Sequence, residues 1–313
     1  MGSSAVIQLS TLFQQIINGL SLGSVYALIA VGYSLVYSIL SFSNFAHGGF
    51  LIVGGYACYI LLMGINVTPT FSLSPIDSVW LACLGALLAG GLVAVVTERL
   101  AYKPIRERTS VTLYLLIASM GVSIVIENLF IISPLGGRMR ALPQDMFPSQ
   151  IFDLGGGVTV SSSSMISLVC AVVFLGGLQF FLTKTRWGLA IRAAACDLRT
   201  AGLMGINTSL LIGIVFFVAG LLASVSGIFL SYRYTITPQL GAITIKAFVA
   251  AVIGGLGSLP GAVVGSLLLG LAEMLVAGFI SSQLRDLVVF SMLVIVLLIK
   301  PAGFFGKQIS DKI

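Results

Sequence analysis

Long, unbroken apolar runs constrain this chain more than any other feature of its sequence. Several runs approach the length of about 20 residues that an α-helix needs to cross a bilayer. Only 8% of the 313 residues are charged and 58% are hydrophobic, whereas a soluble domain carries roughly 25% charged residues. A membrane β-barrel would instead show alternating segments of about 10 residues. The sequence therefore predicts an all-α, polytopic helical bundle with about eight or nine transmembrane segments.

The expected spans follow from the apolar runs and the polar loops between them. They lie at residues 16–40, 50–63, 80–100, 112–132, 165–183, 210–232, 262–280 and 287–299. A glycine-rich stretch from Ile243 predicts one more helix, which ends in a turn at Ser258–Gly261. We expect residues 1–313 to form a single transmembrane domain with broken or re-entrant helices. Two sets of small residues are expected to let helices approach closely: Gly19 with Gly23, and Gly257 with Gly261 and Gly265.

Basic residues gather in a few loops, and these loops fix the predicted topology. Lys103–Arg108, Lys184–Asn207 and Lys300 with Lys307 are expected in the cytoplasm. The C-terminus is therefore predicted to be cytoplasmic, and span parity puts the N-terminus outside. The formal charge of +6 arises largely from these loops, so it does not indicate a nucleic-acid partner. No Lys or Arg precedes Arg99, so we expect no cleavable signal peptide.

Residues 133–164 form the longest polar stretch, and alternation of the spans puts this loop outside the membrane. It contains Pro134 and the run Gly155–Gly157. Loops of this length often carry a function. Docking of an external protein and a simple solvated cap both remain open as interpretations.

The segment Lys184–Asn207 is the longest interruption of apolar sequence on the predicted cytoplasmic side. It carries four basic residues, Lys184, Arg186, Arg192 and Arg199, against the single acid Asp197. Small residues fill the positions between these charges, and apolar spans tether both ends. A basic, partly helical loop of this length predicts a docking element for a cytoplasmic partner.

Asn44 and His47, the only histidine of the chain, lie with Gly48 and Gly49 between the first two spans. Irregular backbone at membrane depth is tolerated only where it is buried or lines a wet cavity. The two polar side chains therefore either cap free backbone groups or contact a permeating solute.

Three other charged positions lie within or beside the apolar runs. Glu273 falls inside the run 262–280, where a charge requires a partner or a cavity. Lys246 starts the glycine-rich region and is expected to face the outer aqueous side. Glu98 and Arg99 are expected at the rim of the third span, where they snorkel or pair.

Sequence patterns of enzymes are absent or out of context. The G-x-S-x-G match at Gly19–Gly23 lies within a helical run and lacks a partner His and acid. No G-x-x-x-x-G-K-[ST] occurs, so the chain is not expected to bind ATP. One histidine and four cysteines without a CxxC pair predict neither a metal site nor a disulfide. We therefore predict no catalytic residue.

A self-contained channel or secondary transporter would need ion-coupling acids, for which only Glu127 and Glu273 are candidates.

Several motifs occur in order along nearly the whole chain. They are Ile17–Tyr33 (INGLSLGSVYALIAVGY), Asn44–Gly48 (NFAHG), Glu98–Pro104 (ERLAYKP), Arg192–Asn207, Lys246–Gly261 and Lys300–Gly306 (KPAGFFG). Together they resemble the branched-chain amino-acid ABC importer permeases of the LivH type. Several motifs in the right order make this resemblance far more specific than any single glycine pattern.

The resemblance implies one membrane subunit of a heteromeric importer in the bacterial inner (plasma) membrane. Its partners would be a second, related permease, two ATP-binding subunits and a periplasmic amino-acid-binding protein. ATP and Mg²⁺ would be bound by the partner subunits, and this chain would hold no cofactor. The implied cargo is a branched-chain or other neutral amino acid. Urea or a short amide is the alternative cargo, and a channel or secondary transporter is the less supported alternative class.

The family's cytoplasmic coupling segment falls on Arg192–Asn207, which we expect to form a short amphipathic helix ended by Gly205. Charges at Arg192, Asp197 and Arg199 would fix its register on an ATPase. The expected coupling residues are Arg192, Ala193, Ala194, Ala195, Asp197, Arg199, Gly205 and Asn207. The expected substrate-pathway residues are Asn44, His47, Gly48 and Glu273. Two positions depart from the family's pattern: Cys196 and Gly49 stand where relatives often carry an acid.

Overall fold

The computed structural model describes residues 2–68, 71–73, 75–109, 111–133, 135, 138–148, 150–153 and 158–306. Seven helices in this part of the chain are long and apolar enough to cross a membrane. They are Ser10–Leu40, Val79–Arg108, Thr112–Ile132, Ser162–Lys184, Thr208–Arg233, Leu259–Phe279 and Ser282–Ile299. Two shorter apolar helices, His47–Met63 and Pro238–Gly254, lie where the sequence predicted broken spans. The all-α, polytopic prediction is therefore confirmed.

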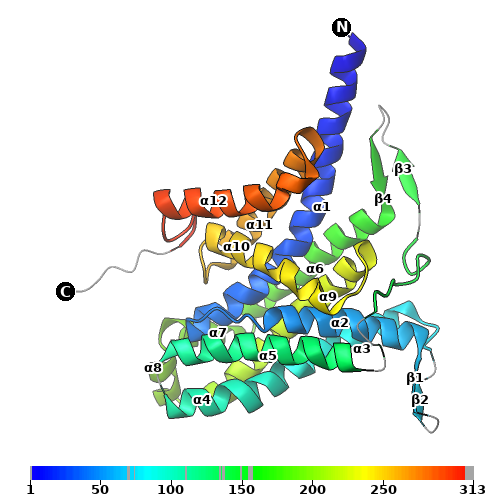
Figure 1. Cartoon of the computed structure of the whole chain (residues 1–313). Helices are drawn as coiled ribbons and strands as arrows, with labels where there is room; N and C mark the ends of the chain where they lie inside the picture. The colour runs from blue at the N-terminus through cyan, green and yellow to red at the C-terminus, as the bar shows by residue number, and fades with distance from the viewer. Residues whose placement is uncertain are drawn as a thin grey trace. The chain divides into compact units, whose positions relative to one another are not determined.

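The helices and strands have these bounds in chain order (Figure 1). The first part holds α1 (Gly2–Leu40), α2 (His47–Met63), β1 (Ile65–Thr68), β2 (Phe71–Leu73), α3 (Val79–Thr97), the π-helical turn η1 (Glu98–Tyr102), α4 (Lys103–Arg108) and α5 (Thr112–Ile132). The second part holds β3 (Ile151–Asp153), β4 (Thr159–Ser161), α6 (Ser162–Lys184), α7 (Arg186–Cys196), α8 (Leu198–Leu203) and α9 (Thr208–Arg233). The 3-10 turn η2 (Pro238–Ile243), α10 (Thr244–Gly254), α11 (Leu259–Phe279), the 3-10 turn η3 (Ser282–Leu284) and α12 (Arg285–Ile299) complete the chain.

Two predicted loops contain short antiparallel hairpins. Strands β1 and β2 pair within the loop after α2, and β3 pairs with β4 within residues 133–164. This second loop ends at Ser161, because α6 already begins at Ser162. Pro134 and Gly155–Gly157 lie outside the described residues, as does Lys307.

The chain forms two compact units. Unit 1 comprises Met1–Ser34, Phe147–Leu175 and Ile245–Ile313, and unit 2 comprises Leu35–Met146 and Gly176–Thr244. The prediction of a single transmembrane domain stays a prediction.

Helices α2, α3 and α9 pack on one another in unit 2 (Figure 1). Glycine permits the closest approach: a Cβ on Gly227 of α9 would collide with the carbonyl oxygen of Leu51 in α2. Large side chains fill the remaining space of this unit, and the biggest fully buried ones include Phe50, Tyr56, Tyr102 and Phe216. The core that holds the candidate site is thus rigidly packed.

In unit 1, α1 lies against α11 through small residues, as the sequence predicted. A Cβ on Gly270 would lie 2.6 Å from the Cα atom of Gly23. The predicted helix–turn–helix is also confirmed: the Ser258 hydroxyl accepts a hydrogen bond from the backbone N–H of Gly261 at the start of α11. The predicted glycine ladder is wrong at Gly257, which lies in the turn before α11 at a φ of 84° rather than on a helix face.

Candidate functional site

The predicted site residues lie in both units. Asn44, His47 and Gly48, with the whole of Arg192–Asn207, belong to unit 2, and Glu273 belongs to unit 1.

Asn44 lies in the irregular segment between α1 and α2. Helix α1 ends at Leu40, and Ser41 then adopts a positive φ of 52°. Asn44 is only 1% exposed, and its Oδ1 accepts hydrogen bonds from the Ala46 N–H at 3.2 Å and from the Tyr102 hydroxyl at 2.7 Å. Its Nδ2 has no acceptor among the described residues. One end of this amide therefore caps local structure, and the other end is a buried donor available to a ligand.

His47 is the first residue of α2, and it is fully buried. Its backbone N–H donates to the Asn44 carbonyl oxygen at 3.2 Å, and its ring meets Phe50 edge to face. Gly48 lies against η2, where a Cβ would be 2.9 Å from the Gly241 carbonyl oxygen. The close approach requires glycine at position 48.

Gly49 packs directly against α5. A Cβ there would lie 2.8 Å from Cδ1 of Ile126 in α5. In this chain an aliphatic side chain of α5 therefore occupies the space that a larger residue would need.

Glu273 has partners on two other helices, α1 and α10, both contacts lying within unit 1. It is 3% exposed, and its Oε1 accepts from Lys246 Nζ at 3.0 Å while its Oε2 accepts from the Tyr26 hydroxyl at 3.1 Å. Lys246 also pairs with Asp286 of α12 at 2.7 Å. Lys246 is mostly buried and holds these two acids, and the expectation that it faces the outer aqueous side stays a prediction. A charge within a span here has a partner, as a buried ion requires.

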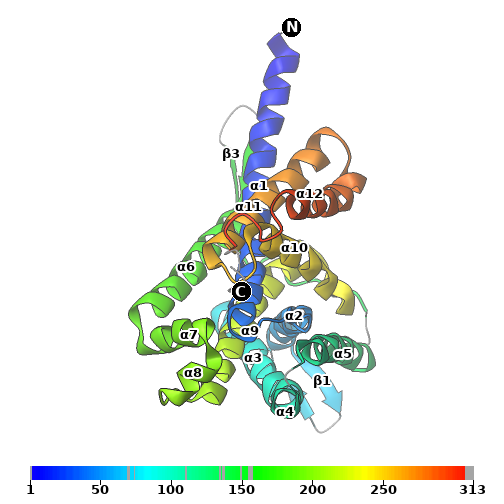
Figure 2. The ribbon, with the colours of Figure 1, turned by 90° about the vertical axis from the view of Figure 1, so that its left-hand side faces the viewer.

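The segment Arg186–Asn207 forms two helices, α7 and α8, rather than the single amphipathic helix that the sequence predicted (Figure 2). Helix α7 folds back on the end of α6. The Thr185 hydroxyl caps α7 by accepting from the Gly188 N–H at 3.0 Å, and a Cβ on Gly188 would collide with the backbone of Phe181 and Leu182. Arg192 Nη1 donates to the Leu182 carbonyl oxygen, so this cation satisfies the C-terminus of α6.

Three of the predicted coupling residues set the ends of helices. Asp197 breaks the predicted helix by capping α8: its Oδ1 accepts from the backbone N–H groups of Arg199 and Thr200 at 2.8 and 3.1 Å. The hydrogen bond from the Thr200 hydroxyl, followed by these amides, lowers the pKa of Asp197. Gly205 has a φ of 87°, which confirms the left-handed cap. Asn207 caps α9 by accepting from the Leu210 N–H at 3.1 Å.

The outer surface of α7 and α8 combines apolar and basic groups. Among the alanines, Ala194 is buried while Ala193 and Ala195 are exposed. Arg199 is exposed, and Leu203 and Met204 beside it are 81% and 80% exposed. Exposed apolar side chains next to cations are typical of an interface with another protein.

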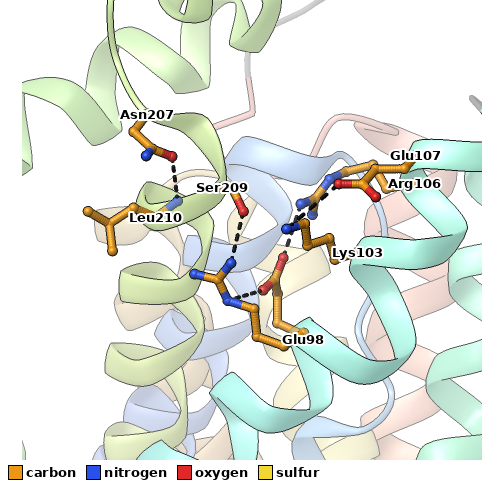
Figure 3. Close-up of polar contacts among 8 residues, drawn as sticks. Glu98, Lys103, Arg106, Glu107, Asn207, Ser209 and Leu210 are labelled. Carbon is orange, nitrogen blue, oxygen red and sulfur yellow. Dashed lines mark hydrogen bonds and ion pairs between the residues drawn. The ribbon is translucent and has the colours of Figure 1, made fainter.

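A charge network at the turn between α3 and α4 extends beyond the predicted Glu98–Arg99 pair (Figure 3). Glu98 is completely buried and pairs with Arg106 at 3.0 Å and with Arg99 at 3.5 Å. Arg99 Nη1 donates to the Ser209 hydroxyl of α9 at 3.0 Å. The predicted pairing of Glu98 and Arg99 is confirmed, but Glu98 does not lie at an exposed rim. The sequence does place Glu98 close to four cations, which indicates an ion-pair network. It does not indicate that Glu98 is buried.

No group of three or more His, Cys, Asp or Glu side chains in the described part of the chain could hold a metal ion.

Comparison with known proteins gives a consistent result. The family described as "Branched-chain amino acid transport system / permease component" matches residues 15–297. The chain is 37% identical to the high-affinity branched-chain amino acid transport system permease protein LivH of Salmonella typhimurium, over 96% of this chain and 97% of that protein. It is also 37% identical to the permease protein BraD of Pseudomonas aeruginosa, over the same shares of both chains.

More distant proteins also match. The probable LivH of Methanocaldococcus jannaschii is 29% identical over 89% of this chain and 88% of that protein. Among solved structures, PsaBC from Streptococcus pneumoniae in complex with Fab aligns over 94% of each chain, with 14% identity and a TM-score of 0.49.

Proposed function

The chain belongs to the family of permease components of branched-chain amino acid transport systems, and from this membership we propose that it is the membrane-spanning subunit of an ATP-binding-cassette importer for branched-chain or other neutral amino acids. The observation that carries the proposal is the match to LivH along 96% of this chain and 97% of that protein. Relatives of this family are transport permeases rather than enzymes, and the seven long apolar helices fit a multi-pass permease.

The importer would need partners that this chain does not supply. They are a second, related permease, two ATP-binding subunits and a periplasmic amino-acid-binding protein. ATP and Mg²⁺ would be held by the ATP-binding subunits. The complex would lie in the bacterial inner membrane, with α7, α8 and the C-terminus of this chain in the cytoplasm. The basic residues at Lys103–Arg108 and Lys184–Arg199 support this orientation.

An ATP-binding subunit would dock on the outer surface of α7 and α8. Leu203, Met204 and Arg199 are the exposed side chains that would contact it. Asp197, Gly205 and Asn207 would act indirectly, because they fix the helix ends that present this surface. Arg192 would also act indirectly, through the α6 terminus that it caps.

The solute path would pass the broken segment between α1 and α2. Asn44 supports this assignment, because its Nδ2 is a buried donor without a protein acceptor among the described residues. Such a donor can meet the carboxylate of an amino acid. His47 and Gly48 flank this position and would keep the segment in its irregular conformation. For Glu273, the contacts with Lys246 and Tyr26 favour a structural role over direct contact with solute.

Affinity purification of the tagged chain from its native membrane tests the partners. We expect ATP-binding subunits and a second permease to co-purify with the wild-type chain. The substitution Leu203→Asp puts a charge in the proposed interface and should release the ATP-binding subunits while the second permease is retained. The control Leu113→Asn alters an exposed leucine of α5 and should keep all partners. Purification without any ATP-binding subunit would contradict the proposal and favour a self-contained transporter.

The cargo is tested by competition in the same membranes. Uptake of labelled leucine should be inhibited by unlabelled isoleucine and valine. Inhibition by urea or acetamide, but not by these amino acids, would replace the proposed cargo with a short amide.

A further inference from the structure

The π-helical turn η1 touches both parts of the candidate site within unit 2. Helices with a widened turn of this kind often carry function, because the extra residue changes the direction of neighbouring side chains. In this chain the turn spans Glu98–Tyr102 and joins α3 to α4. Two side chains of the turn contact other parts of unit 2: Arg99 contacts α9, and Tyr102 contacts Asn44.

Arg99 connects the turn to the end of the coupling segment. Its Nη1 donates to the Ser209 hydroxyl at 3.0 Å, and Ser209 lies in the first turn of α9, two residues after the helix cap Asn207. The guanidinium then lies along α9, because its Nη2 would be 3.5 Å from a Cβ on Gly213, one helical turn further. A movement of α8 and of the start of α9 therefore displaces a group that Arg99 holds directly.

Tyr102 connects the same turn to the broken segment. Its hydroxyl donates to Asn44 Oδ1 at 2.7 Å, and its ring is fully buried between Phe42 and Phe216, with centroid distances of 5.6 and 5.4 Å. This hydrogen bond holds the oxygen of the Asn44 amide, rather than its nitrogen, toward Tyr102. The orientation of the unpartnered Nδ2 therefore depends on the position of Tyr102.

Ion pairs brace the turn between these contacts. Glu98 is completely buried, and two arginines, Arg99 and Arg106, hold its carboxylate (Figure 3). Separating a buried carboxylate from its cations is costly, so the ion pairs keep the turn intact when either end is displaced. A rigid element with one contact at each end transmits displacement instead of absorbing it.

We propose that the turn Glu98–Tyr102 is the relay between the ATPase-docking segment and the solute path. Arg99 is the positioning residue on the docking side, and Tyr102 is the positioning residue on the path side. Displacement of α9 at Ser209 shifts the turn, and Tyr102 then reorients the Asn44 amide. The proposal rests on the proposed function as an ATP-driven importer.

The test measures how many leucine molecules are taken up per ATP hydrolysed. It uses proteoliposomes that contain the complete complex, purified with its native partners, and an excess of leucine-loaded binding protein. The variant Tyr102→Phe removes only the hydroxyl that reaches Asn44, and Ser209→Ala removes only the acceptor of Arg99. Tyr114→Phe, on the exposed surface of α5, and Ser38→Ala, whose hydroxyl bonds its own helix, are the matched controls.

We expect uptake per ATP to fall roughly three- to tenfold in each relay variant, as for the loss of one hydrogen bond. The controls should stay within about twofold of the wild type. Since the two contacts act in series, uptake per ATP in the double variant should be no lower than in the more impaired of the two single variants.

Each other result has a defined meaning. The relay is overturned if uptake per ATP in both relay variants equals that of the controls. It is also overturned if the fold loss in the double variant is the product of the two single fold losses. If Tyr102→Phe fails to assemble, Ser209→Ala decides alone, because this bond is only partly buried. A wild-type complex that takes up no leucine with ATP contradicts the proposed function itself, which separates that failure from failure of the relay.

Discussion

At the scale of single residues, Asp197 determines local structure through hydrogen bonds more than through charge. Its carboxylate accepts from two backbone N–H groups and, at 2.5 Å, from the Thr200 hydroxyl. The Thr200 hydroxyl is the main cause of its lowered pKa. Because the pKa of the folded state is depressed, the cap is fully formed above the ordinary Asp value of about 3.9. Its stabilisation is lost only as the pH falls through the lowered value.

This reading predicts that Asp197→Asn keeps α8 folded at neutral pH, since Asn caps helices about as well as Asp. Asp197→Ala should increase backbone amide exchange over residues 198–203. Hydrogen exchange measured by mass spectrometry on the purified complex compares the two variants. Equal exchange in Ala and Asn variants would show that charge, rather than capping, is what matters at this position.

The buried acid Glu273 leads to a second prediction at this scale. In Lys246→Met, the carboxylate loses its cation, and the free energy of unfolding should fall by about 3 kcal/mol. The double variant Lys246→Met/Glu273→Leu should recover much of this loss, because no unpaired charge is left buried. The control is Lys103→Met, whose partner Glu107 is well exposed and whose pair contributes little. Thermal unfolding of the detergent-purified complex measures all three. Equal shifts of Tm in the two single variants would contradict the buried pair.

At the scale of elements, the α6–α7 corner fixes where the proposed docking surface lies. Gly188 lets α7 cross directly over the last turn of α6, and Arg192 satisfies the carbonyl group that this turn leaves open. The position of α8, which follows α7, depends on the same corner. Small residues here are therefore part of the docking geometry even though they contact no partner.

Gly188→Leu should consequently prevent docking of the ATP-binding subunits, because its side chain would collide with the α6 backbone. The matched control is Gly202→Ala in α8, where the nearest atom to a new Cβ is Thr208 Cγ2 at 3.5 Å. Alanine is also the better helix former, by about 1 kcal/mol. Co-purification of ATP-binding subunits is the measurement. Normal docking by the Gly188→Leu complex, or loss of docking in Gly202→Ala, would count against this geometry.

Most helices could be predicted from the sequence, because apolar runs bounded by polar loops define their ends. Helix α5 has the predicted bounds, Thr112–Ile132, and α2 ends at the predicted Met63. The break within the coupling segment was not predicted, although Asp197 is a residue type that favours the start of a helix. The π-helical turn could not be recognised from hydrophobic periodicity, because the apolar run of α3 is followed directly by the basic cluster.

The polar landmarks of the site were predictable by position but not by contact. Asn44 and His47 stand out as polar residues beside glycines between apolar runs. Nothing local indicates that Tyr102 would reach Asn44 or that Arg99 would reach Ser209, since the partners are 58 and 110 residues apart in the chain. Such pairings depend on how helices pack, which a single sequence does not encode in any short pattern.

At the scale of the whole molecule, the chain is a multi-pass membrane protein with seven long apolar helices and two short ones in its described part. Its family match extends over residues 15–297 and so takes in both units. Within unit 2, the proposed docking surface, the charged turn and the broken segment are linked by contacts from α8 to Asn44. The account therefore attributes energy input to partner subunits and conduction to this chain and its related permease.

Accumulation of labelled leucine by proteoliposomes is the most direct test of ATP-driven import. Vesicles carry the complete complex, the loaded binding protein is added outside, and ATP is either enclosed or replaced by ADP. The account predicts accumulation above the external concentration only with enclosed ATP, and none with vesicles that hold this chain alone. Leucine that enters equally with ADP, or through the chain alone, would contradict ATP-driven import and identify a self-contained channel or transporter.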